Sequence, residues 1–136
     1  MQSRIEEEVG LLRERFPTLE HGPRFEWILL PVFPLPPGRF NKPASRIMFA
    51  LPIGYPQTGP DNFFVEVDLR LANGSPPPAF NPNRDSSSGP APIPGEWGWF
   101  SWHPQVWRPA AKVTDGDNLL VFVTGIQMCL RGEEAG

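Results

Sequence analysis

Cysteine, basic charge and long apolar runs are all scarce in this sequence. Its 136 residues include one cysteine, which excludes an internal disulfide and a cysteine-based zinc site. Lys and Arg number 12 against 15 Asp and Glu, for a formal net charge of −3, whereas nucleic-acid binding requires a basic face. No apolar run approaches the roughly 18 to 20 residues that span a membrane, and the N-terminal MQSRIEEEVG lacks the regions of a signal peptide. We therefore expect a soluble cytoplasmic protein that binds neither nucleic acid nor membrane and uses no metal or cofactor.

Proline, in contrast, is abundant. The chain has 19 prolines, where average usage gives roughly seven, and proline fits poorly inside helices and central strands. A single domain over residues 1–136, with one modest core, must therefore contain long loops. The most extreme is 73–96, NGSPPPAFNPNRDSSSGPAPIPGE, which is predicted to be a long surface loop without regular structure. Loops of this length in a compact domain are usually functional or disordered.

An N-terminal helix is predicted over residues 1–17. Ser3 is a suitable N-cap, and the glutamates that follow it suit the positive end of a helix dipole. Pro17 ends the helix. The apolar residues recur at helical spacing as one stripe, formed by Ile5, Val9, Leu12 and Phe16.

A C-terminal helix is predicted over residues 114–131. Thr114 and Asp117 resemble a capping box, and Gly132 is a suitable stop. Gly125 and several β-branched residues weaken the helix prediction, so a strand stays open as the alternative. The apolar stripe of this segment consists of Leu119, Phe122, Val123, Ile126 and Leu130.

Three apolar segments between these helices predict strands. They are FEWILLPV at 25–32, RIMFALPI at 46–53 and NFFVEVDLRL at 62–71. The third alternates apolar and charged residues, which is typical of an antiparallel sheet with one buried face and one exposed to water. An aromatic segment follows the long loop at 97–107. The order of elements predicts an α+β fold, with an N-terminal helix, an antiparallel meander of about four strands, a long loop and a C-terminal helix.

The turn after the second of these strands resembles the Tyr-Pro turn of ubiquitin-conjugating enzymes, whose pattern is P-x-x-Y-P-x-x-P-P. Pro52, Tyr55, Pro56 and Pro60 occupy matching places, and Gly59 replaces the first of the paired prolines. WRPA at 107–110 resembles the Trp-x-Pro-Ala segment that precedes the long helix of the same superfamily. The resemblance implies a UBC-like fold. Proline makes the turn a rigid corner and a buried tyrosine ties down neighbouring groups, so we interpret Tyr55, Pro56 and Pro60 as structural.

A closer resemblance is to a bacterial branch, the prokaryotic ubiquitin-conjugating-like family lettered E. Its ordered motifs are matched here by FPLPPG at 33–38, LPIGYP at 51–56, DNF at 61–63, LANG at 71–74, WGWFSWH at 97–103 and WRP at 107–109. The resemblance implies three kinds of neighbour: a ubiquitin-like protein, an adenylating activating enzyme and often a metal-dependent deconjugating peptidase. It also implies a role in antiviral defence.

The cysteine that relatives use is missing. Ubiquitin-conjugating enzymes carry ubiquitin as a thioester, which requires a nucleophilic thiolate. In the superfamily the cysteine lies roughly eight residues before the Trp-x-Pro-Ala tryptophan, and counting back from Trp107 reaches Trp99. The usual His-Pro-Asn run is also absent, although FNPN at 80–83 is similar to it. Cys129 lies in an apolar segment and is interpreted as a buried hydrophobe. A pseudoenzyme that forms no thioester is therefore predicted, and its status as an enzyme stays open.

Ser101 and His103 are the remaining candidate catalytic residues. In an extended segment, residues two apart share a face, and a histidine beside a serine acts as a base that activates the hydroxyl. The pair therefore suggests an oxyester in place of a thioester. The alternative is a structural His103 that bonds to backbone beside Pro104. A Ser/His hydrolase is a weaker interpretation, because no Gly-x-Ser-x-Gly elbow or oxyanion hole is present.

Four tryptophans gather in the aromatic segment. Trp97, Trp99, Trp102 and Trp107 supply apolar area to the core or, with Arg108, bind a partner. Alternation places Trp97 and Trp99 with Ser101 on one face and Trp102 with Phe100 on the other, so one buried and one partly exposed row are expected. The leading hypothesis is a component of a bacterial ubiquitin-like modification pathway that binds the activating enzyme or the ubiquitin-like protein. The alternative is an aromatic-rich module that binds a peptide or a sugar.

Overall fold

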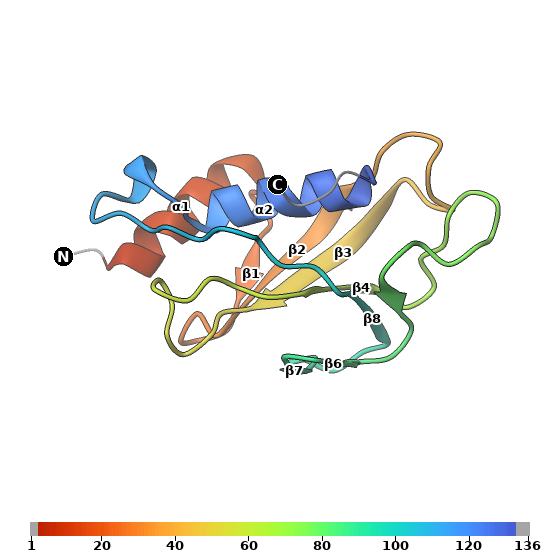
Figure 1. Ribbon diagram of the computed structural model, residues 1–136, viewed down its shortest axis with the longest axis horizontal. Helices are drawn as coiled ribbons and strands as arrows, with labels where there is room; N and C mark the ends of the chain where they lie inside the picture. Colours follow the sequence, from red (N-terminus) through yellow and green to blue (C-terminus); the bar gives the residue numbers. More distant parts are fainter. Residues whose placement is uncertain (1–2, 133–136) are drawn as a thin grey trace.

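Two helices lie on one face of an antiparallel sheet (Figure 1). The structure is a computed structural model and describes residues 3–132. The sheet order is β1-β2-β3-β4-β8-β5, and β6 pairs with β7 in a separate hairpin on the other side of the sheet. In chain order the elements are α1 (Arg4–Arg15), β1 (Glu20–His21), β2 (Trp27–Pro34), β3 (Ala44–Ala50), β4 (Phe63–Glu66), β5 (Phe80–Asn81), β6 (Asp85–Ser86), β7 (Gly89–Pro90), β8 (Trp97–Phe100), the 3₁₀ helix η1 (Val113–Asp115) and α2 (Leu119–Leu130).

The predicted α+β fold is confirmed. The four longer strands β2, β3, β4 and β8 form an antiparallel meander, and the two-residue strands β1 and β5 add one short edge strand on either side. The N-terminal helix packs against α2, so both lie over the same apolar face of the sheet. This face holds the main core.

Both helices are capped by side chains. Ser3 and Glu6 form a capping box at the start of α1. The C-terminal segment is a helix and not a strand, but it begins later than Thr114: the cap of α2 is Asn118, whose Oδ1 accepts a hydrogen bond from the N–H of Val121 at 3.0 Å. The Asn118 amide also donates to the carbonyl of Val113 at 3.1 Å. These two bonds separate η1 from α2 and set the starting point of the helix.

The expectation of one face exposed to water is wrong. Leu29, Met48, Phe64 and Trp97 point away from the helices and are buried in a second cluster. Part of the long loop, including Ala91, covers them. Both faces of the central strands are therefore apolar.

The predicted strand at 62–71 ends early, at Glu66. The Lys42 ammonium lies 3.2 Å from a carboxylate oxygen of Glu66 and 2.6 Å from one of Asp68. The Asn41 side chain accepts from the N–H of Arg70 at 3.0 Å. These contacts draw the chain away from the sheet, which alternation in the sequence does not reveal.

The segment 73–96 contains three short strands and is held in place by side-chain hydrogen bonds. The Arg84 guanidinium donates to the carbonyls of Ala91, Ile93 and Gly95 at 2.8, 3.0 and 3.1 Å. Asn62, at the start of β4, donates to the hydroxyls of Ser87 and Ser88 at 2.9 and 3.0 Å. The prediction that this segment lacks regular structure is therefore wrong at β5, β6 and β7.

Candidate functional site

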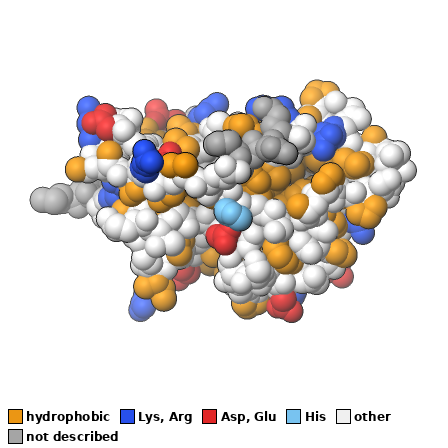
Figure 2. Space-filling view, viewed as in Figure 1, with side chains coloured by type: hydrophobic (Ala, Val, Ile, Leu, Met, Phe, Trp, Pro, Cys, Tyr) orange, Lys and Arg blue, Asp and Glu red, His pale blue; other side chains and the backbone are white. Residues whose placement is uncertain are grey.

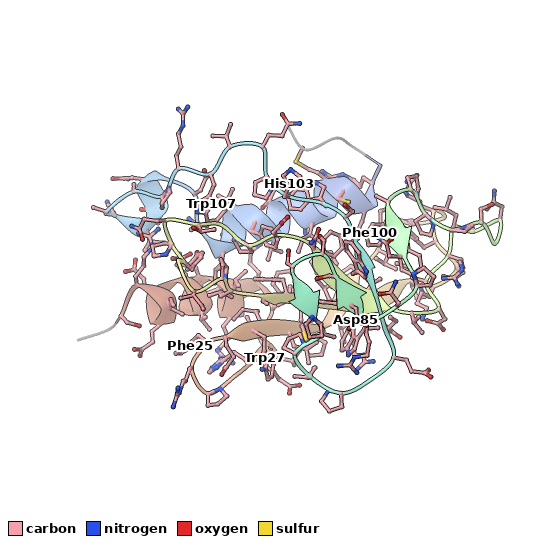
Figure 3. The ribbon with its side chains drawn as sticks, turned by 60° about the horizontal axis from the view of Figure 1, so that its bottom comes forward. Phe25, Trp27, Asp85, Phe100, His103 and Trp107 are labelled. Carbon is pink, nitrogen blue, oxygen red and sulfur yellow. The ribbon has the colours of Figure 1, made fainter. Side chains whose placement is uncertain are left out.

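The candidate site centres on residues 101–108, which we call the crossover segment. It leaves β8 and runs alongside α2 toward η1 (Figure 1). In Figure 3 its residues His103 and Trp107 lie near α2, whereas Asp85 and Trp27 lie lower in the view. All the predicted catalytic residues and two of the predicted partner-binding tryptophans lie on this segment.

Two indoles fix the path of the crossover segment by packing on glycines. A Cβ at Gly59 would lie 2.5 Å from the Trp107 ring, and the Trp107 Nε1–H donates to the carbonyl of Pro56 at 2.7 Å. A Cβ at Gly125 would lie 2.3 Å from the Trp102 ring. Trp107 thus attaches the segment to the Tyr-Pro turn and Trp102 attaches it to α2. In this structure a side chain at position 59 would clash with the Trp107 ring, so glycine fits there.

A buried carboxylate joins the Tyr-Pro turn to both helices. Glu8 of α1 is 1% exposed. Its Oε1 accepts hydrogen bonds from the Tyr55 hydroxyl and, at 2.7 Å, from the N–H of Leu119, while its Oε2 accepts from the Arg4 Nε at 2.8 Å. Burial and the hydrogen bond to Glu8 raise the pKa of Tyr55. These are the contacts of a structural tyrosine.

His103 is exposed and faces an acidic residue. Its Nδ1 lies 3.6 Å from Oδ1 of Asp61, whose other oxygen accepts from the Ser88 hydroxyl at 3.3 Å. Figure 2 shows a histidine beside an acidic side chain in the middle of one face. The expected bond from His103 to backbone is not made within residues 3–132. At 3.6 Å this contact with Asp61 is longer than a hydrogen bond, and because both side chains are exposed it does not fix the orientation of the imidazole.

Ser101 and His103 line different pockets. The Ser101 pocket, of about 610 Å³, lies between Arg39, Ala79 and Cys129. The His103 pocket, of about 260 Å³, lies between the Tyr-Pro turn and Trp107. Within residues 3–132 no hydrogen bond joins Ser101 to His103, and a serine and its base must lie within hydrogen-bond reach. Alternation does not apply to the pair because β8 ends at Phe100.

The position expected for a catalytic cysteine is part of the sheet. Trp99 lies in β8, opposite Phe64 of β4. Cys129 is partly buried in α2 and borders the Ser101 pocket. Burial raises the pKa of the Cys129 thiol to about 11, although the Arg39 charge opposes this shift. The thiol is therefore protonated near neutral pH and is a poor nucleophile.

The tryptophans lie on the two faces that alternation predicts, but their exposure differs from the prediction. Trp97 and Trp99 pack in the second cluster, and Trp102 packs with Phe100 on the helix side. Each row contains one buried and one partly buried ring, so the expectation of one buried row is wrong. Trp97 is 1% exposed and lies under the Arg46 guanidinium at 4.4 Å, so it belongs to the core and not to a contact surface.

The other predicted contact residues lie at the surface to different degrees. Trp99, Trp102 and Trp107 are partly exposed, and Arg108 is exposed. An apolar groove of about 290 Å³ lies between the crossover segment and α2. We call it the α2 groove, and its lining includes Trp102, Val106, Trp107, Val121, Gly125 and Met128.

Sequence reasoning missed the residues that act through distant contacts. Asp61 lies in the DNF motif at 61–63, which was the available signal for it. Glu8 is one of three consecutive glutamates, and Arg39 is one of several arginines in loops, so no local pattern distinguishes either of them. Within residues 3–132 no cluster of three or more metal-ligating side chains occurs. No helix in that range is long and apolar enough to cross a membrane.

The helix, the antiparallel meander, the Tyr-Pro turn and the helix after the crossover segment define an α+β protein of the ubiquitin-conjugating-like class. Among family models, the one described as Prokaryotic E2 family E matches residues 8–133, and the chain belongs to this family. Searches of curated proteins and of solved structures found no match. Membership of the family implies a role in ubiquitin-like conjugation.

Proposed function

We propose that this protein binds and positions partners in ubiquitin-like conjugation without carrying a thioester. One observation supports this most directly: the only thiol is in α2, with a pKa raised by burial to about 11, and Trp99 of β8 occupies the expected position of the nucleophile. A thiol that stays protonated neither attacks an activated acyl group nor leaves as a thiolate at a useful rate. A binding role uses the same fold without that chemistry.

The α2 groove is suited to an apolar part of a partner. Val106 and Val121 are 55% and 44% exposed at its edge, and aromatic rings in a groove are typical anchors of protein interfaces. Figure 2 shows hydrophobic side chains around the histidine on the same face. The α1 helix adds a second surface, since Glu6, Glu7, Arg13 and Arg15 are exposed along it. We assign the groove to the ubiquitin-like protein and α1 to the activating enzyme.

Two other functions stay predictions. An oxyester on Ser101 needs a base, and His103 borders a different pocket. A peptide- or sugar-binding module would use the same partly exposed tryptophans. A place in antiviral defence is likewise a prediction that follows from the resemblance alone.

The test combines the purified protein with the ubiquitin-like protein and activating enzyme of the same genome and ATP. We expect a stable complex by gel filtration and no covalent adduct on a non-reducing gel. Cys129→Ala should form the complex equally well. An adduct that thiols release and that Cys129→Ala abolishes would overturn the proposal, as would the absence of any complex. A hydroxylamine-sensitive adduct lost in Ser101→Ala would establish the oxyester instead.

A matched pair of variants tests the groove. Val121→Asp replaces an apolar contact of the groove with a charge that loses water on binding without gaining a partner, so the complex should weaken about tenfold or more. Val32→Asp makes the same change at a residue of β2 that is 65% exposed and should have no effect. Equal affinities for both variants would remove the groove from the proposal.

A further inference from the structure

The Arg39 guanidinium borders the Ser101 pocket and, within residues 3–132, has no hydrogen-bond partner. Arg39 is partly buried there, and its Nε is buried with no hydrogen-bond partner. Within residues 3–132 its side chain forms no hydrogen bond or ion pair, and its one ring contact is with Phe40 at 5.5 Å. Withdrawing a charged donor from water without an acceptor is costly. The arrangement is therefore that of a site for an acceptor.

The surroundings of Arg39 offer donors and positive charge. Ser101 and Gln105 border the pocket, and Arg131 adds a second positive charge at its edge. Trp102 also borders the pocket, and its buried Nε1 has no hydrogen-bond partner in the part of the chain that the structure describes. No aspartate or glutamate is among the lining residues within 3–132. The remaining walls are apolar and come from Phe40, Pro77, Pro78, Ala79 and Phe100.

The C-terminal end of α2 partly stabilises the positive charge of Arg39. A Cβ at Gly132 would lie 3.0 Å from an Nη of Arg39, and the C-terminal end of a helix favours a cation. However, no carbonyl within residues 3–132 accepts a hydrogen bond from this guanidinium. The helix end therefore stabilises the charge, but within residues 3–132 the planar fork of N–H donors on the Arg39 guanidinium forms no hydrogen bond. Such a fork matches the two oxygens of a carboxylate.

We propose that the Ser101 pocket binds the free carboxylate at the end of an extended peptide, with Arg39 as the principal contact. The apolar walls and the volume of about 610 Å³ leave room for residues before the carboxylate. This inference rests on the proposed function and deepens it. The acyl group that relatives carry as a thioester is a carboxylate in its free form, so a component without a reactive thiol holds the partner's end as an acid. No covalent bond forms or breaks.

The first experiment uses acetyl-Ala-Ala-Gly with a free C-terminal carboxylate and measures binding by calorimetry. The amidated peptide should bind at least about tenfold more weakly, because a charge-assisted hydrogen bond is lost. Arg39→Gln should weaken binding of the acid peptide by a similar factor and leave binding of the amidated peptide unchanged. Arg24→Gln, the same change at an exposed arginine, is the matched control and should have no effect. Equal binding of acid and amide by the unaltered protein overturns the proposal without any variant.

Cys129 gives an independent readout of location, because it is the only thiol and borders this pocket. At about ten times its dissociation constant, the acid peptide should slow alkylation of Cys129 by iodoacetamide about tenfold, since only the free protein reacts. The amidated peptide at the same concentration should not slow the alkylation of Cys129. Binding of the acid without protection would place the peptide elsewhere and overturn the assignment.

Further probes test whether the pocket prefers the carboxylate at a peptide end to other anions. Inorganic phosphate, or a peptide amide with an internal glutamate, should compete weakly. If either matches the acid peptide, the pocket is a general anion site and the assignment to a peptide end is wrong. A Glu133→Gln/Glu134→Gln double variant removes the next carboxylates in sequence without creating a new one beside Arg39. It should bind the acid peptide at least as tightly as the unaltered protein, and weaker binding would contradict the assignment.

The outcomes distinguish this inference from the proposed function. If the ubiquitin-like protein binds the unaltered protein and Arg39→Gln equally, the carboxylate pocket fails and the binding role stands. If the acid peptide binds through Arg39 but the ubiquitin-like protein does not bind, the pocket stands and the binding role fails.

Discussion

Cys129 is the residue that decides whether this protein forms a thioester, because it is the only thiol in the chain. Its position in α2 gives it partly apolar surroundings, and its pKa of about 11 keeps it protonated. Trp99, where a nucleophile was expected, pairs across the sheet with Phe64. A thioester is therefore disfavoured twice: Trp99 occupies the position of the nucleophile, and the thiol of Cys129 stays protonated.

The reactivity of Cys129 is a direct test at this scale. At pH 8 a thiol with a pKa near 9 is about one tenth ionised, whereas one with a pKa near 11 is about one thousandth ionised. Alkylation of the folded protein by iodoacetamide should therefore be about 100-fold slower than alkylation in urea. Because burial raises the pKa of the thiol, the alkylation rate should keep rising beyond pH 10. Stability should fall between about pH 9 and pH 11, because the thiol of the unfolded state ionises first. A rate that levels off below pH 9 would show a reactive thiolate.

The pairing of Ser101 with His103 shows where prediction from sequence ends at the residue scale. Residues two apart share a face only while the strand continues, and β8 ends at Phe100. Beyond that point the path follows the packing of Trp102 on Gly125 and of Trp107 on Gly59. The partner of His103 is Asp61, 42 residues earlier in the chain. A single sequence contains no signal for such a long-range contact beyond the motif itself.

At the scale of elements, the contact between the crossover segment and α2 depends on Gly125. Glycine at this position weakens the helix prediction, and the structure supplies the reason for its presence, since the Trp102 ring occupies the space of a side chain. A local cost in helix propensity is thus offset by a close contact between two elements. The glycine belongs to the site as much as the tryptophan does.

Gly125→Ala should separate these two effects. Alanine improves helix propensity by about 1 kcal/mol, but the clash with Trp102 should outweigh it and destabilise the protein by about 1 to 3 kcal/mol. Gly10→Ala is the matched control in α1, because a Cβ there meets nothing within 4 Å. It should stabilise by about 0.5 to 1 kcal/mol. Urea unfolding of both variants measures the difference, and stabilisation by Gly125→Ala would show that the segment is free to move away.

The existence and order of the elements could be predicted, whereas several boundaries could not. The apolar stripes locate both helices, and the runs at 25–32 and 46–53 overlap β2 and β3. The start of α2, in contrast, depends on Asn118 bonding to Val113, and the end of β4 depends on Lys42. The order within 73–96 depends on Arg84 bonding to three carbonyls. In each case a tertiary contact of one polar side chain overrides the local pattern.

At the scale of the whole molecule, Glu8 connects the parts that the family motifs mark separately. Its carboxylate joins α1, the Tyr-Pro turn through Tyr55 and the first turn of α2 through Leu119. Arg4, which bonds to the same carboxylate, also donates to the carbonyl of Ala110 at 2.5 Å, just after the crossover segment. The N-terminal helix thereby holds the regions on both sides of the crossover segment. The candidate site depends on this network although no member of it lies in the site.

Glu8→Gln should therefore destabilise the whole protein. Removing the charge leaves the partly buried Arg4 beside a neutral group. It also gives the Tyr55 hydroxyl and the Leu119 N–H a weaker acceptor, at a total cost of about 2 to 4 kcal/mol. Glu7→Gln, at an exposed position of the same helix, should change stability by less than about 0.5 kcal/mol. Tyr55→Phe should cost about 1 to 3 kcal/mol. The double variant Glu8→Gln/Tyr55→Phe should cost less than the sum of the two, by about 0.5 to 3 kcal/mol, because both remove the same bond. Strict additivity in urea unfolding would show that Glu8 and Tyr55 act separately, and the network would then not transmit stability from α1 to the turn.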